Sequence, residues 1–174
     1  MEDRLNGIFS NINDWLRYAE TKSAALLATN GLVIFGIFRV LHSQDSINTL
    51  LIYYSYFVIF LLIISSCFLL ISFSPSLQIP WLFKPSNIDE KNDNLLFFGH
   101  AAKYTPQKYL DTLSKASNEK KSESSNLELM IAKQIIANST IAMRKFNIFN
   151  IAIWLTISAI ITPVAMYLIK GKSH

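Results

Sequence analysis

The hydrophobic pattern of the chain is dominated by three long apolar stretches, at residues 23–41, 50–73 and 146–169. The second contains no charged residue, and the third contains none before Lys170. Apolar runs of about 18 or more residues are typical of membrane-spanning helices. As helices, the three would be about 28, 36 and 36 Å long, enough to cross a hydrocarbon core of about 30 Å. The pattern therefore predicts an all-α integral membrane protein with three transmembrane helices.

The segment before the first span, residues 1–22, predicts an amphipathic helix that runs into the membrane. Ile8, Ile12, Trp15 and Ala19 recur at helical spacing on one face. Trp15 also suits the boundary between membrane and water. Residues 1–22 are therefore expected to form an amphipathic N-terminal helix that leads into transmembrane helix 1 at residues 23–41.

The region between the second and third spans, residues 74–145, predicts a small and mainly helical soluble part. Thr105 followed by Pro106 is a favourable helix start, and that helix is expected to end near Lys115. Ser125 and Glu128 have the spacing of a capping box. No glycine or proline follows before Pro163, so one helix is predicted over 126–169, continuous from the soluble region through the membrane.

The soluble half of this last helix carries a stripe that resembles a coiled-coil seam. Its members recur at alternating four- and three-residue steps, and they are Leu127, Ile131, Gln134, Asn138, Ile141 and Lys145. The stripe predicts either pairing between subunits or packing against the chain's own short helices.

Composition and charge placement agree with a membrane protein and give it an orientation. Hydrophobic residues make up 51% of the chain and charged residues only 16%, against about 25% in soluble domains. Ten lysines and arginines lie in 74–145, three in 1–22 and none in the link 42–49. The positive-inside rule then places the N-terminus and residues 74–145 in the cytoplasm and the C-terminus in the periplasm of a bacterial inner membrane.

The sequence contains no recognisable arrangement of catalytic residue types. His42, His100 and His174 lie far apart, and Cys67 is the single cysteine and lies within the second span. No metal, nucleophile or P-loop motif occurs. We therefore expect no enzyme, no catalytic residue, no metal and no cofactor.

The soluble region combines positive charge with aromatic residues. Residues 74–145 hold ten basic and seven acidic side chains, a net charge of +3. Stacking surfaces beside cations suit nucleotides or single-stranded nucleic acid, and they also suit the anionic inner leaflet. The interleaved residues are Trp81, Phe83, Lys84, Phe97, Phe98, Lys103, Tyr104 and Lys108.

Asn30 is the main polar candidate inside the membrane. Polar groups at membrane depth are costly and mark functional sites. Lys22, Asn30, Val33 and Ile37 fall along one helical face, which predicts a pore-lining or pore-supporting stripe with Lys22 at its cytoplasmic mouth. The alternative is that Asn30 bonds between helices and Lys22 reaches lipid phosphates.

Three parts of the chain carry a family resemblance. They are residues 18–31, with the sequence YAETKSAALLATNG; residues 97–106, with the sequence FFGHAAKYTP, followed by Tyr109 and Leu110; and Gln134 with Lys145 in the last helix. These stretches resemble the transmembrane effectors of the bacterial Pycsar anti-phage systems, which share an acidic-x-Lys-Ala/Ser stretch leading into Leu-Leu-x-x-Asn-Gly. Compared with the acidic-x-Lys-Ala form of this stretch, Glu20 and Ser23 are mild changes. The resemblance covers nearly the whole chain.

The resemblance implies a homo-oligomeric, preferably tetrameric, channel of anti-phage immunity, gated by a nucleotide or oligonucleotide that a partner nucleotidyltransferase supplies. Related stand-alone effectors, such as that of the Hailong system, look like tetrameric channels governed by single-stranded DNA oligomers. Because 174 residues leave little room for a separate cyclic-nucleotide-binding domain, we expect an oligonucleotide rather than a cyclic mononucleotide. The residues predicted to contact it are Lys103, Tyr104, Lys108, Arg144 and Lys145.

Two other classes of function fit the same sequence. A non-conducting anchor or scaffold would dock a partner protein or anionic lipid through the basic region. A holin-like pore would assemble by crowding and need no ligand. Both predict that no nucleotide changes ion flux.

Overall fold

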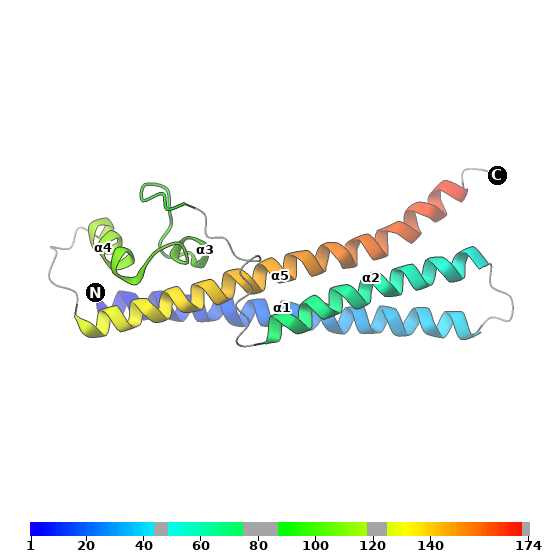
Figure 1. Cartoon of the computed structure of the whole chain (residues 1–174), viewed down its shortest axis with the longest axis horizontal. Helices are drawn as coiled ribbons and strands as arrows, with labels where there is room; N and C mark the ends of the chain where they lie inside the picture. Colours follow the sequence, from blue (N-terminus) through cyan, green and yellow to red (C-terminus); the bar gives the residue numbers. More distant parts are fainter. Residues whose placement is uncertain (44–48, 75–86, 118–124, 172–174) are drawn as a thin grey trace. The chain divides into compact units, whose positions relative to one another are not determined.

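The computed structural model describes residues 1–43, 49–74, 87–117 and 125–171, with side chains described as far as residue 162. Its elements are α1 (Glu2–Ser43), α2 (Thr49–Phe73), α3 (Phe98–Ala101), α4 (Pro106–Ala116) and α5 (Asn126–Gly171) (Figure 1). No strand occurs within these residues, so the predicted all-α class is confirmed. Trp81, Phe83 and Lys84 lie outside the described residues.

The chain divides into two compact units, each of which contains part of α1 and part of α5. The first unit, called here the soluble unit, comprises residues 1–20 and 78–147; the second, called the membrane unit, comprises residues 21–77 and 148–174. α1 is one helix from Glu2 to Ser43, so the predicted boundary between an amphipathic helix and a first span falls inside a single element. α5 is likewise one helix of 46 residues.

The soluble unit is built around a core to which four helices contribute. α1 supplies Leu5, Ile8 and Ile12, all buried at the spacing of one helical face. α5 also contributes buried side chains to this core, and α3 and α4 add aromatic and leucine side chains. Trp15, which the periodicity places on the same face as Ile8 and Ile12, is 37% exposed. The central residues from α3, α4, α5 and the preceding loop are Leu95, Phe98, Tyr109, Leu113, Ala132 and Ile135.

Two of the helix starts form as the sequence predicts. At α4, the Thr105 side chain accepts from the Lys108 amide, and Pro106 occupies the first helical position. At α5, the Glu128 amide donates to Ser125 Oγ at 3.1 Å, and the Ser125 amide donates to the Glu128 carboxylate at 3.1 Å. This reciprocal capping box fixes where the long helix begins.

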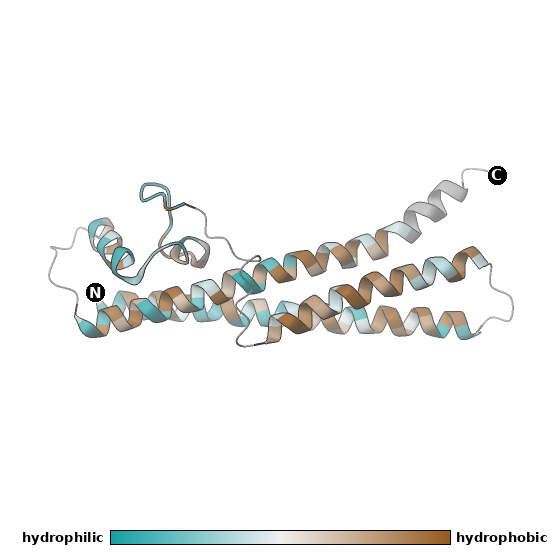
Figure 2. Cartoon of the chain, viewed as in Figure 1, coloured by the Kyte–Doolittle hydropathy of each residue, from teal (hydrophilic) through white to brown (hydrophobic). Residues whose placement is uncertain are grey.

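The membrane unit packs residues 21–43 of α1, α2 and the second part of α5 around two small apolar clusters. Leu26, Leu69 and Ala152 form one cluster, and Val58, Leu62 and Ala159 form the other. The outward surface carries large apolar side chains, and α2 is hydrophobic along most of its length (Figure 2). Three helices, α1, α2 and α5, are long and apolar enough to cross a membrane.

Part of the predicted stripe on α5 packs against α1 of the same chain. Asn138 donates to Asn13 Oδ1 of α1 at 2.7 Å, and Lys145 is also buried against α1. Leu127 and Gln134, by contrast, are exposed. Packing against the chain's own helix therefore accounts for two members of the stripe, while two others face outward.

Candidate functional site

The charged centre of the soluble unit is Asp93. Its side chain is only 3% exposed, and it accepts from Lys103 Nζ at 2.6 Å, from the Tyr104 hydroxyl at 3.2 Å and from the Asp89 amide at 2.9 Å. Burial acts to raise the pKa of the Asp93 carboxyl, but these hydrogen bonds outweigh it and the pKa is lowered. Asp93 is therefore a buried carboxylate whose charge is balanced by a lysine 10 residues away.

Two of the predicted ligand contacts, Lys103 and Tyr104, donate hydrogen bonds to this carboxylate. The Lys103 side chain is 12% exposed, and Tyr104 is 3% exposed with its ring packed edge-on against Tyr109 at a centroid distance of 6.3 Å. Burial, reinforced by Asp93, raises the pKa of Tyr104 to about 12, so its hydroxyl is a neutral donor at physiological pH. In this arrangement both side chains hold a loop in place.

Lys108, the third predicted contact, pairs with Glu90 of the same loop at 3.0 Å. Both side chains are nearly half exposed, at 45% and 44%. The hydrogen bond from Lys108 lowers the pKa of the Glu90 carboxyl. An exposed pair of this kind is screened by solvent and stabilises the fold little, so a ligand can displace it at little cost.

The last two predicted contacts lie on α5. Lys145 is 5% exposed, and its Nζ donates to Glu20 Oε1 on α1 at 2.9 Å. Arg144 is partly buried. Hydrogen bonds and ion pairs connect Lys103, Tyr104 and Lys108 with the 89–93 loop, and an ion pair connects Lys145 with α1. The five candidates thus form two groups.

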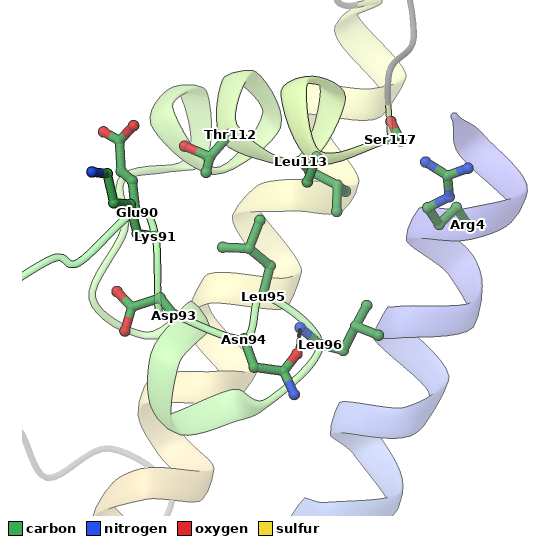
Figure 3. A pocket seen from close by; sticks show the side chains of 11 residues that line it. Arg4, Glu90, Lys91, Asp93, Asn94, Leu95, Leu96, Thr112, Leu113 and Ser117 are labelled. Carbon is green, nitrogen blue, oxygen red and sulfur yellow. Dashed lines mark hydrogen bonds between the residues drawn. The ribbon is translucent and has the colours of Figure 1, made fainter.

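A pocket of about 470 Å³ lies where the loop at 90–96 faces the start of α1 and the end of α4. Figure 3 shows Arg4 on one side, Glu90 and Lys91 on the opposite side, and Leu95 and Leu113 between them. The further lining residues are Asp93, Asn94, Leu96, Thr112, Ala116 and Ser117. The carboxylates that Lys103 and Lys108 neutralise are therefore part of the wall of this pocket.

In the membrane unit, Asn30 joins all three membrane helices. It is fully buried, its Nδ2 donates to Ser65 Oγ at 3.0 Å, and its Oδ1 accepts from Thr156 Oγ1 at 3.0 Å. Ser65 in turn donates to the Ala152 carbonyl at 2.8 Å. These three side chains therefore bond between helices. Such bonds are favoured in a bilayer because an unsatisfied polar group is costly in hydrocarbon.

The other residues of the predicted pore stripe differ in what they contact within the chain. Val33 and Ile37 are partly buried and pack against the cluster that contains Val58 and Leu62. Lys22 Nζ lies 5.6 Å from the centre of the Phe149 ring, a cation–π distance. Among the described residues, no group of three or more metal-ligating side chains is found.

A family model described as the Pycsar effector protein domain (PycTM) matches residues 4–170. The chain belongs to this family. No curated protein and no solved structure matches the chain.

As a Pycsar effector, the protein is a membrane effector of anti-phage defence. Membership implies a cyclic nucleotide signal and a membrane context. The comparison therefore supports a cyclic nucleotide as the signal, and the expectation of an oligonucleotide rather than a cyclic mononucleotide stays a prediction. The effector family is also not a known enzyme class.

Several residues of these sites were not identified from the sequence. In the sequence, Asp93 and Glu90 are two of the acidic residues of a basic region. The local signal is the run Asp-Glu-Lys-Asn-Asp-Asn, which is typical of Asx turns. Ser65 and Thr156 bond to other helices, although serine and threonine within a helix are commonly expected to bond to their own backbone. Ser66 follows that expectation, since its hydroxyl donates to the Leu62 carbonyl at 2.8 Å.

Proposed function

We propose that this Pycsar effector is a homo-oligomeric ion channel or pore, preferably a tetramer, that a nucleotide or oligonucleotide opens or holds closed. Opening depolarises the bacterial inner membrane and arrests growth of the infected cell. The observation that carries the proposal is that α5 is one unbroken helix whose first part belongs to the soluble unit and whose second part belongs to the membrane unit. A continuous helix transmits a displacement along its axis because its backbone hydrogen bonds resist stretching.

The soluble unit is the proposed sensor, in the cytoplasm. Lys103, Lys108, Arg144 and Lys145, with Tyr104, are the proposed ligand-contact residues. Of these, Lys108 is the most accessible, and Lys103 and Tyr104 would act through the loop that they hold. A partner nucleotidyltransferase is the proposed source of the signal.

The proposed pore or gate element is the α1 face that carries Lys22, Asn30, Val33 and Ile37. The buried polar cluster supports this role because it ties α1 to α2 and α5 at one level. A movement of α5 would then change the position of α1. The ligand shifts the gate only by the difference between its affinities for the closed and open states.

The experiment is ion flux from proteoliposomes that contain the purified protein. We expect flux that changes on addition of a cyclic nucleotide or of a short single-stranded DNA, and that falls with Lys22→Glu. Flux that no nucleotide alters would support the holin-like pore. No flux with any ligand, and no effect of Lys22→Glu or Asn30→Ala on toxicity, would support the anchor.

Replacement of Arg144 and Lys145 by alanine tests the α5 contacts. Each phosphate contact that is lost lowers the slope of log affinity against log salt concentration, by about 0.7 for a single strand. We expect weaker oligonucleotide binding and a flatter salt dependence in fluorescence anisotropy. An unchanged affinity and slope would remove these two residues from the ligand site.

A further inference from the structure

We propose that the pocket between the start of α1, the 90–96 loop and the end of α4 binds the signal, as a nucleoside phosphate. Arg4 and Lys91 would contact phosphate, and Leu95 and Leu113 would flank the base. This inference rests on the proposed function, and it adds a site whose direct cations differ from the five residues predicted from the sequence.

The first argument is size and lining. Small-molecule sites in proteins are commonly about 300–1,000 Å³ with apolar walls and a few polar groups. This pocket has a volume of about 470 Å³ and room for one nucleotide unit. Leu95 and Leu113 provide an apolar surface, and both are nearly buried in the core of the unit. The groups available to a ribose or a base edge are those of Asn94, Thr112 and Ser117.

The second argument is charge. The two carboxylates in the wall, Asp93 and Glu90, are each paired with a lysine, at 2.6 and 3.0 Å. Their charges are therefore largely balanced before any ligand arrives, and the wall additionally presents Arg4 and Lys91. A guanidinium has five N–H donors, so Arg4 can keep its contacts within the protein and still take a phosphate oxygen.

The third argument is that the loop is held in place. Asp89 Oδ1 accepts from the amides of Lys91 and Asn92 at 3.2 and 3.3 Å. The Asn94 amide donates to His100 Nδ1 at 2.8 Å. These bonds fix the backbone on which Lys91 and Leu95 sit, so that binding requires little ordering of the loop.

The positions of the two cations give different expectations for a cyclic mononucleotide and for a linear oligonucleotide, which share the same phosphate chemistry. Arg4 and Lys91 lie on opposite sides of the pocket (Figure 3). A cyclic mononucleotide has one phosphate and would depend mainly on one cation. A linear oligonucleotide has a phosphate on each side of a given nucleoside and would depend on both.

The test measures binding of labelled 3′,5′-cyclic ribonucleoside monophosphates, and of a short single-stranded DNA, to the full-length protein in detergent. The variants are Arg4→Ala, Lys91→Ala and Ala116→Phe; the last fills the pocket from the exposed end of α4 without changing any charge. Lys133→Ala is the matched control, since Lys133 is an exposed lysine of the same unit outside the pocket lining.

We expect Ala116→Phe and at least one cation variant to weaken binding by about tenfold or more, the usual effect of losing a charge-assisted hydrogen bond. Lys133→Ala should bind as the wild type does, and Arg4→Lys should recover part of the loss. Wild-type binding that all three pocket variants leave unchanged would overturn this site and leave the proposed function intact. No binding of either ligand class to the wild type would overturn both.

Discussion

At the scale of single residues, the soluble unit depends on the buried carboxylate of Asp93. We expect Asp93→Asn to lower the free energy of unfolding by about 3 kcal/mol, because it leaves Lys103 as a largely buried cation without its anion. Thermal unfolding in detergent measures this loss. Asp14→Asn, at an exposed position of α1, is the control and should change the stability little.

The pH dependence of stability follows from the same group. The folded-state pKa of Asp93 lies below its unfolded value of about 3.9. Ionised Asp93 therefore stabilises the fold above about pH 4, and this stabilisation is lost as the pH falls through the folded-state pKa. The wild type should lose more stability between pH 5 and pH 3 than Asp93→Asn does. Equal losses in the two proteins would contradict the assignment.

Asn30 makes the corresponding prediction in the membrane unit. Asn30→Ala removes bonds to Ser65 and Thr156, and hydrogen bonds between membrane helices contribute about 0.6–2 kcal/mol each. We expect a loss of about 1–3 kcal/mol, measured by unfolding in detergent. The neighbouring Thr29→Ala is the control, because Thr29 Oγ1 donates within its own helix, to the Ala25 carbonyl at 2.9 Å. A loss as large in Thr29→Ala would contradict the role given to the buried cluster.

The sequence identified residue types at these sites better than it identified their partners. Asn30 is unusual from its position alone, because a polar group in a span is costly. Lys145 is instead a member of the predicted stripe on the last helix and a predicted ligand contact. Their partners could not be inferred: Thr156 is 126 residues from Asn30, and Glu20 is 125 residues from Lys145. Such pairs are set by how the helices pack, which periodicity within one helix does not specify.

At the scale of elements, the sequence was most informative where the signals are local. The capping box at Ser125 and the Thr105–Pro106 start lie within three or four residues of the helix ends that they fix. The helix at 98–101 was not predicted, since one turn with no side-chain cap leaves no periodic signal. Single-turn elements depend on tertiary contacts such as the stacking of Phe98 on Phe146, whose ring centres are 5.1 Å apart.

The continuity of α5 gives a prediction for this element. Asn147 is the last residue of the first unit on α5, so Asn147→Pro places a proline at the division between the two units. A proline inside a helix removes a backbone hydrogen bond and destabilises the helix by about 3 kcal/mol. If α5 transmits the signal, this variant should still bind nucleotide but should lose the response of ion flux.

Asn147→Ala is the matched control for this variant, because it changes the same side chain and keeps the helix intact. It should retain both binding and response. A normal flux response in Asn147→Pro would show that α5 does not need to be continuous.

At the scale of the whole molecule, the positive-inside rule predicts the topology. Cys67 is the single cysteine, so a Cys67→Ala background allows single cysteines to be placed by substitution. Ser46→Cys, in the short link, should react with a membrane-impermeant maleimide in intact spheroplasts. Lys133→Cys should react only after permeabilisation. The reverse pattern would invert the orientation and place the proposed sensor outside the cell.

The distances along the chain between bonded residues have a consequence for biogenesis. Asp93 finds Lys103 and Tyr104 only 10 and 11 residues away, and Tyr109 donates to the Leu95 carbonyl 14 residues away. Contacts this local can form while the ribosome is still translating α5. The bonds from Asn138 to Asn13 and from Lys145 to Glu20 must instead wait until α5 has been made. The loop and α4 are therefore expected to assemble first during synthesis, and the joining of α5 to α1 completes the soluble unit.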